Sequence, residues 1–336
     1  MLAVVAGDST KSPANNVIGA AKRYRRGMSP EVVGRPEPPL LELLEDRVRS
    51  GRSISVCLPA RNEEATVGHI VGTIRRTLVD RVPLVDEIVV IDDGSVDATA
   101  AAAADEGARV VAEASILADE RPGQGKGNVL WKSLYATTGD IVCWIDADIR
   151  NFGPHFVTRL VAPLLRSSDT LFTKAYYQRP FHGEPTGGGR VTELMARPLL
   201  SHLFPTIADI VQPLAGEYAG RRDALEAVPF VEGWGVEFGL LVDIAERFGR
   251  AAIAQVDLGV REHRNRPLHE LGAPALAILV TALRRAGLET VSPDYAELLR
   301  FDDDATPERI GVATSERPPM LSIPAYRAKF GRELSA

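Results

Sequence analysis

Two aspartates separated by one residue close an apolar run. Residues 141–145 read IVCWI, and Asp146 and Asp148 follow. Two carboxylates at the end of a strand can share a hard divalent cation, and such a cation neutralises the charge of a bound diphosphate. An Asp-x-Asp pair is common by itself, and a solvated strand end is the alternative interpretation. The pair therefore predicts a cation-assisted site only where the fold gathers other polar groups around it.

Two more polar clusters follow apolar runs in the same way. Residues 59–64 read PARNEE after one run, and residues 92–95 read DDGS after the next. The carboxylate of Asp93 could accept hydrogen bonds from ring N–H groups of a nucleobase, although a plain turn that caps the following helix is the alternative. Because ligands of parallel α/β sheets bind at the carboxyl ends of the strands, the three clusters together predict a nucleotide site.

Two glycine-containing loops could hold anions. Residues 122–128 place three glycines and Lys126 before a predicted helix, where backbone N–H groups and an ammonium group can approach a phosphate. Residues 186–192 place three glycines before Arg190 and Thr192, whose guanidinium and hydroxyl suit a phosphate or a carboxylate. A flexible turn and a structural hinge are the respective alternatives.

His263 stands in a charged run, residues 261–266, directly after a predicted strand. Histidine is a common metal ligand, but a lone histidine is more often held by structural contacts. Its sequence neighbourhood does not bring it near Asp148, so only the fold could make it a ligand.

Composition excludes several classes of function. The 336 residues are 45% hydrophobic and 25% charged, which is typical of a globular protein, and the formal net charge of -6 disfavours a broad surface for nucleic acid or anionic lipid. Cys57 and Cys143 lie in apolar runs and are too few for a disulfide framework, which favours a reducing compartment. Without a signal peptide or an apolar run of about 18 residues, we expect a cytoplasmic protein that does not insert into membranes.

From Ser53 onward, short β-rich runs alternate with helical runs. Apolar strands that are each followed by a helix indicate a doubly wound, mainly parallel sheet covered on both faces, an α/β fold. The second half is less regular, with a predicted strand over 170–178 and predicted helices over 191–203, 238–248 and 270–286. We expect an N-terminal arm (1–50), a nucleotide-sugar-binding half (51–150), an acceptor-binding half (151–291) and a C-terminal tail (292–336).

Over roughly residues 53–325 the chain resembles the glucosyl-3-phosphoglycerate synthases and the related mannosyl-3-phosphoglycerate synthases. The resemblance is carried by residues 53–67, 122–131, 139–148, 186–200, 211–222, 233–241 and 254–272. It implies a retaining glycosyltransferase of the type A fold, a homodimer that uses a nucleotide sugar, 3-phosphoglycerate and a divalent cation such as Mg²⁺, Mn²⁺ or Co²⁺.

The resemblance also implies roles for individual residues. Implied donor-binding residues are Pro59, Ala60, Arg61, Glu63, Asp93, Lys126, Asp146, Ala147 and Glu237. Implied acceptor-binding residues are Gly189, Arg190, Thr192 and Asn265. The implied metal ligands are Asp148 and His263, and the implied catalytic residues are Asp148, Leu214 and Glu237.

The choice of donor rests on one departure from the family pattern. Where the glucosyl enzymes have Asp-Ser-Gly-Ser, this chain has a second carboxylate, Asp93. That carboxylate could accept from the N1 and N2 donors of guanine as well as from N3 of uracil. We therefore expect mannosyl transfer from GDP-mannose to 3-phosphoglycerate in compatible-solute synthesis. Glucosyl transfer from UDP-glucose, with relaxed donor use, is the alternative, and a nucleotidyltransferase or a non-catalytic nucleotide-sugar sensor is a more distant one.

Overall fold

The computed structural model describes residues 38–181, 184–262, 267–288, 295–301 and 304–332. The chain divides into two units, Met1–Gly34 and Arg35–Ala336, and every described residue belongs to the second. Within these residues, no helix combines the length and apolar character that a membrane crossing requires.

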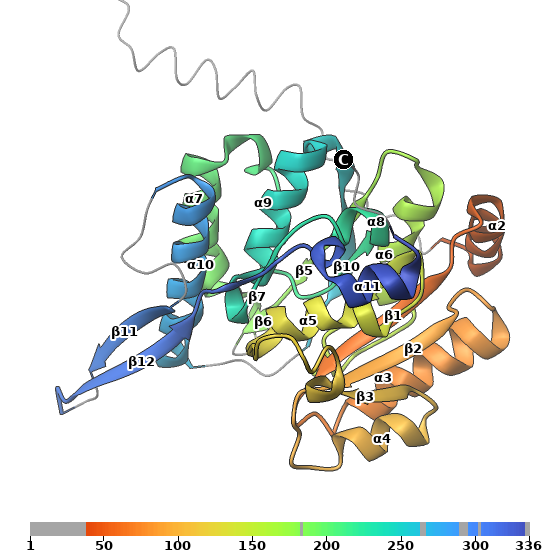
Figure 1. Ribbon diagram of the computed structural model, residues 1–336, viewed down its shortest axis with the longest axis horizontal. Coiled ribbons are helices and arrows are strands. Elements are labelled where there is room, and N and C mark those ends of the chain that lie inside the picture. The colour runs from red at the N-terminus through yellow and green to blue at the C-terminus, as the bar shows by residue number, and fades with distance from the viewer. Residues whose placement is uncertain (1–37, 182–183, 263–266, 289–294, 302–303, 333–336) are drawn as a thin grey trace, which may run out of the picture. The chain divides into compact units, whose positions relative to one another are not determined.

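A seven-stranded sheet forms the centre of this unit (Figure 1). Its order is β10-β5-β8-β4-β1-β2-β3, and β8 alone runs antiparallel to its neighbours. The strands are β1 (Ile54–Ala60), β2 (Glu87–Asp92), β3 (Arg109–Ala112), β4 (Ile141–Trp144), β5 (Phe172–Gln178), β8 (Tyr218–Arg221) and β10 (Ile253–Val260). The α/β fold with a mainly parallel sheet is thus confirmed.

Helices cover both faces of this sheet because successive strand residues point to opposite sides. In β1, Val56 and Leu58 pack into one core, whereas Cys57 packs into the other. The first core includes α2 (Leu40–Ser50), α3 (Val67–Ile74), α4 (Thr99–Asp105) and α6 (His155–Arg166). The second includes α5 (Gly125–Ala136), α7 (Arg197–Leu203), α8 (Arg222–Leu225), α9 (Val236–Phe248), α10 (Gly272–Arg285) and α11 (Pro324–Phe330).

The sheet continues across residue 150, so both predicted halves share one layer. β8 comes from the second half of the chain, yet it lies between β4 and β5. Residues 40–50, which we placed in the N-terminal arm, form α2, and its Asp46 accepts from Arg166 on α6. The division into four segments stays a prediction.

Several elements differ from the predicted ones. The predicted helix over 191–203 begins with a π-helical segment, Thr192–Ala196, before α7, where Pro198 supplies no N–H. The proline-rich tail contains an antiparallel hairpin of β11 (Tyr295–Phe301) and β12 (Pro307–Ala313), which packs on α10. The remaining short strands are β6 (Pro180–Phe181), β7 (Glu184–Gly187), β9 (Phe230–Val231) and β13 (Glu316–Arg317).

A buried arginine fastens the C-terminal helix to the body. The guanidinium of Arg222 donates to the carbonyl oxygens of Gly139 and Leu134 at 2.7 and 2.6 Å. It also donates to the hydroxyl of Tyr326 in α11, which itself donates to Glu226. Because these acceptors are buried, they depend on this one side chain for their partners.

We expect Arg222→Met to lower the free energy of unfolding by about 3 kcal/mol or more, since it leaves several buried acceptors without a donor. Urea unfolding followed by circular dichroism measures the change. Arg327→Met is the control, because the hydrogen bonds of Arg327 within the described part of the chain go to the nearby carbonyls of Leu321 and Ser322. Equal stability of the two variants would contradict this account of how the tail is held.

Candidate active site

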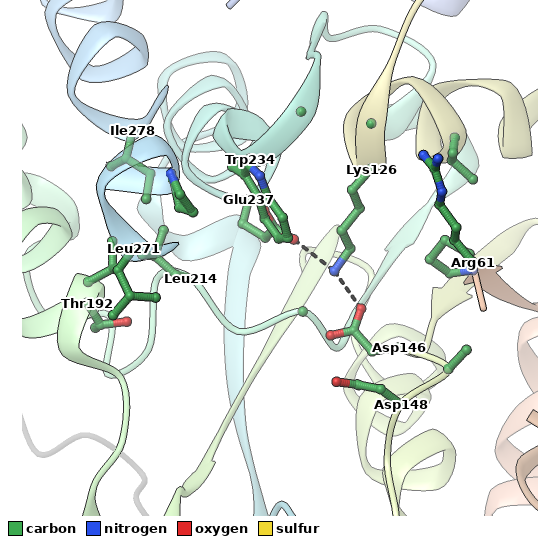
Figure 2. A pocket seen from close by; sticks show the side chains of 18 of the residues that line it. Arg61, Lys126, Asp146, Asp148, Thr192, Leu214, Trp234, Glu237, Leu271 and Ile278 are labelled. Carbon is green, nitrogen blue, oxygen red and sulfur yellow. Dashed lines mark hydrogen bonds and ion pairs between the residues drawn. The ribbon is translucent and has the colours of Figure 1, made fainter. Parts of the chain in front are cut away.

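The carboxyl ends of β1, β2 and β4 open into one pocket of about 540 Å³ (Figure 2). It brings together every predicted site residue that the structure describes. These are Pro59, Ala60, Arg61, Glu63, Asp93, Lys126, Asp146, Ala147, Asp148, Gly189, Arg190, Thr192, Leu214 and Glu237. The other two predicted site residues, His263 and Asn265, lie outside the described residues.

At one end of the pocket, the loops after β1 and β2 are tied together. Asn62 has a positive φ of 57°, its N–H donates to the Ser95 hydroxyl, and its side chain accepts from Val96. This arrangement places Arg61 beside Asp93, with 3.7 Å between the guanidinium and Oδ2. Burial raises the pKa of Asp93, and the Arg61 charge opposes that rise. One oxygen of this carboxylate therefore already faces a cation.

The Asp-x-Asp pair lies at the centre of the pocket. The ammonium of Lys126 sits between two carboxylates, 2.5 Å from Asp146 and 2.9 Å from Glu237 (Figure 2). Burial alone would lower the pKa of Lys126, but attraction to these carboxylates holds it well above its ordinary value. The cations near Asp146 keep the pKa of its carboxyl low despite burial. Lys126 and Asp146 are therefore both charged at neutral pH.

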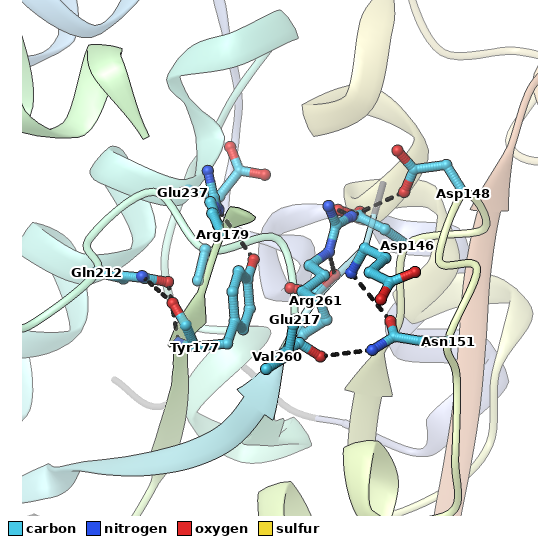
Figure 3. A network of polar contacts seen from close by, with 12 residues as sticks. Asp146, Asp148, Asn151, Tyr177, Arg179, Gln212, Glu217, Glu237, Val260 and Arg261 are labelled. Atoms are coloured by element: carbon cyan, nitrogen blue, oxygen red, sulfur yellow. Dashed lines mark hydrogen bonds and ion pairs between the residues drawn. The ribbon is translucent and has the colours of Figure 1, made fainter. Parts of the chain in front are cut away.

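Arg261 is the second cation of this network, and no motif in the sequence marks its role. Its guanidinium is buried and pairs with Glu217 at 2.7 Å, Asp148 at 2.7 Å and Asp146 at 3.0 Å (Figure 3). Asn151 holds the segment in place, donating to the Val260 carbonyl and accepting from the N–H of Glu262. The chain just before His263 is thereby fixed beside the loop that carries Asp148.

Negative charge at this edge exceeds what the two cations compensate. Burial, together with the charges of Asp148 and Asp146, raises the pKa of Glu63 to about 7. The Asp148 side chain keeps 31% of its surface exposed. Within the described residues, no three His, Cys, Asp or Glu side chains gather closely enough to enclose a metal ion.

The glycines around Lys126 have a packing role. A β-carbon on Gly127 would lie 1.8 Å from the Val231 carbonyl oxygen, and one on Gly125 would lie 2.9 Å from the Cα of Gly233. The N–H of Gly233 donates to the Gln124 carbonyl at 3.2 Å. The glycines therefore let the start of α5 pack directly on the backbone before α9, which sets Lys126 beside Glu237.

The other end of the pocket holds the second glycine loop. Gly189 has a φ of +79°, Thr192 is buried, and Leu271 and Ile278 form the facing wall (Figure 2). This wall could not be predicted from the sequence, because apolar residues of a helix are usually part of the core.

The floor of the pocket is the loop over residues 214–217. The buried ammonium of Lys174 donates to the Ala215 carbonyl at 2.7 Å. A β-carbon on Gly216 would lie 2.1 Å from Oδ2 of Asp146, so only glycine lets the loop approach that carboxylate. The backbone beside Leu214 is thus held against the charged network.

Lys174 predicts how stability changes with pH. Burial lowers its pKa to about 7, despite the opposing charge of Glu237, whereas an unfolded lysine keeps its proton to about pH 10. Between these values the unfolded chain binds more protons, so this lysine makes the free energy of unfolding rise with pH. We expect Lys174→Met to flatten that rise by up to about 1.4 kcal/mol per pH unit in urea unfolding. Identical slopes in both proteins would refute this.

The chain is similar to known glycosyltransferases. The model of the family named glycosyl transferase family 2 matches residues 55–227. A glucosyl-3-phosphoglycerate synthase of Petrotoga mobilis is 44% identical, over 87% of this chain and 93% of the relative. One of Mycolicibacterium smegmatis is 46% identical, over 83% and 92% respectively.

Solved structures of a glucosyl-3-phosphoglycerate synthase are also similar to this chain. A glucosyl-3-phosphoglycerate synthase of Mycobacterium tuberculosis in complex with Mn²⁺, UDP-glucose and phosphoglyceric acid is 46% identical, with a TM-score of 0.77 over 85% of this chain and 95% of that one. Another complex of that enzyme contains glycerol 3-phosphate, with a TM-score of 0.76, 45% identity and coverage of 85% and 96%.

The fold and the pocket at its strand ends define a glycosyltransferase of the type A fold. Within this class, the chain belongs to glycosyl transferase family 2 and there to the family of glucosyl-3-phosphoglycerate synthases.

The expected mannosyl transfer from GDP-mannose is wrong. The relatives of 44% and 46% identity are named for glucosyl transfer, and the solved complex holds UDP-glucose. Asp93 could not decide the donor by itself, because a carboxylate accepts from the N3–H of uracil as readily as from the donors of guanine.

Proposed function

We propose that this protein transfers glucose from UDP-glucose to 3-phosphoglycerate and thereby forms glucosyl-3-phosphoglycerate. The observation that carries the proposal is a single pocket with a nucleoside end, a charged centre and a glycine-Arg-Thr loop. This chain matches two relatives over more than nine-tenths of their length, and both are named as glucosyl-3-phosphoglycerate synthases. Their names support the same assignment here.

The nucleoside end suits uracil. Pro59, Ala60 and Arg61 would line the nucleoside, and the oxygen of Asp93 that does not face Arg61 would accept from the single N3–H of uracil. Lys126 would contact the donor diphosphate, because its ammonium lies in the pocket between two carboxylates. Glu237 would accept from hydroxyl groups of the sugar.

The residues at the centre fit a divalent cation. Carboxylate oxygens are preferred by Mg²⁺ and Mn²⁺. The pKa of Glu63 is raised first by burial and then by the negative charges of Asp148 and Asp146, which a cation would compensate. Asp148 would bind it, with His263 as the second protein ligand and diphosphate oxygens completing the shell. Such a cation neutralises the charge that develops on the departing diphosphate.

The acceptor would bind at the second glycine loop. Gly189, Arg190 and Thr192, together with Asn265, would hold the phosphorylated acceptor through an amide, a guanidinium and a hydroxyl. The acceptor hydroxyl would then attack from the face that the diphosphate leaves, near the backbone of Leu214, so that the sugar keeps its configuration. Positioning would supply much of the rate.

Two wider properties stay predictions. We propose that the enzyme acts in the cytoplasm and that it is a homodimer. Light scattering at several protein concentrations measures the oligomeric state.

The proposed reaction is tested by nucleoside diphosphate release from UDP-glucose and GDP-mannose, each with 3-phosphoglycerate and Mn²⁺. We expect release that depends on acceptor, stops with chelator and is at least about tenfold faster with UDP-glucose. Faster release from GDP-mannose, or release that ignores the acceptor, would contradict the proposal.

Arg190→Ala tests the assignment of the acceptor loop. We expect the KM for 3-phosphoglycerate to rise at least about tenfold, because a charge-assisted hydrogen bond is lost, while the KM for UDP-glucose changes less than about twofold. Steady-state kinetics with each substrate varied in turn gives both values. An equal rise in both would show that Arg190 does not belong to the acceptor site.

A further inference from the structure

Arg179 lines the same pocket, although no sequence motif marks it. It follows β5 directly, and its guanidinium lies over the ring of Tyr177, 5.0 Å from the ring centre. One terminal nitrogen donates to the Tyr177 hydroxyl at 2.9 Å (Figure 3). The aromatic ring and its hydroxyl thus hold the guanidinium in one place.

Arg179 differs from three other cations of the pocket in how its charge is paired. Lys126, Arg261 and Arg61 each face carboxylates within ion-pair distance. Arg179 forms no ion pair with any carboxylate that the structure describes, and its Nε is buried without a hydrogen-bond partner among the described residues. A guanidinium that lines a pocket without a carboxylate partner can pair with an anionic ligand. A planar guanidinium matches a carboxylate or a phosphate.

The position of Arg179 assigns this anion to the acceptor. Its carbonyl accepts from the N–H of Gly188 at 3.2 Å, and a β-carbon on Gly188 would lie 2.5 Å from the Cβ of Arg179. Arg179 therefore packs against the loop that carries Arg190 and Thr192. The field of its charge also reaches the centre of the pocket, where it helps to lower the pKa of Asp146.

We propose that Arg179 recognises a second anionic group of the acceptor, the carboxylate of 3-phosphoglycerate, while the loop with Arg190 and Thr192 holds the phosphate. This inference rests on the proposed function. One guanidinium cannot pair in a fork with both anionic groups of the acceptor at once, so a site for a doubly anionic acceptor needs a second cation. Arg179 would then select 3-phosphoglycerate over acceptors that carry only a phosphate.

The test compares 3-phosphoglycerate with glycerol 3-phosphate, which has the phosphate and lacks the carboxylate. Calorimetric titration in the presence of UDP and Mn²⁺ gives the dissociation constant of each for the wild type, Arg179→Gln and Arg179→Lys. We expect Arg179→Gln to weaken 3-phosphoglycerate at least about tenfold and glycerol 3-phosphate less than about twofold. Arg179→Lys keeps the charge but loses the fork, so its loss should be intermediate.

Arg159→Gln is the matched control. The Nε of Arg159 is also buried without a hydrogen-bond partner among the described residues, but this residue lies on α6 and does not line the pocket. It should keep the preference of the wild type. An unchanged preference in Arg179→Gln, or an equal weakening of both acceptors, would overturn the inference. UDP affinity, measured alongside, should stay within about twofold in a correctly folded variant.

Failure of the proposed function gives a different result. If the wild type bound neither acceptor and released no UDP on adding 3-phosphoglycerate, the proposed function and this inference would both fall. If the wild type released UDP and preferred 3-phosphoglycerate but Arg179→Gln kept that preference, only the role of Arg179 would be wrong.

Discussion

The site depends on the ion pairs that the buried guanidinium of Arg261 forms with three carboxylates. Carboxylates from separate parts of the chain meet at the edge of the sheet, and without compensation their burial would be very unfavourable. Arg261 pairs with Asp146, Asp148 and Glu217, and Lys126 adds a second cation on the other side of Asp146. Removing either cation would leave buried carboxylates without a positive partner. The ion pairs therefore hold the loop with Asp146 and Asp148 against the segments that carry Lys126 and Arg261.

The fold supplies these groups from distant segments. The Asp-x-Asp pair follows β4, Glu217 precedes β8, and Arg261 follows β10, so the antiparallel insertion of β8 beside β4 brings the network together. Lys126 reaches the pocket because two glycines let α5 approach the backbone before α9. The proposed nucleoside end needs only the first part of the sheet, whereas the proposed acceptor end needs β5 and α10.

The first half of the fold and the strand-end clusters could be predicted from sequence, because apolar runs and the polar residues after them are local signals. The partners of Arg261 and Arg179 could not be predicted from sequence. A charged residue in a loop is usually exposed to solvent, and only the fold shows which groups lie opposite it. The tail was also hidden, because proline and charge mask the pairing of β11 with β12. Asp93 shows the same limit, because its carboxylate can accept from either nucleobase and the residue type alone does not choose between them.

We propose that this charged edge binds a divalent cation together with the donor diphosphate, through Asp148. Titration of Mn²⁺ followed by electron paramagnetic resonance, with and without UDP, tests it in the wild type and in Asp148→Asn. We expect UDP to strengthen Mn²⁺ binding in the wild type and Asp148→Asn to weaken it at least about tenfold. Unchanged Mn²⁺ affinity in Asp148→Asn would contradict it.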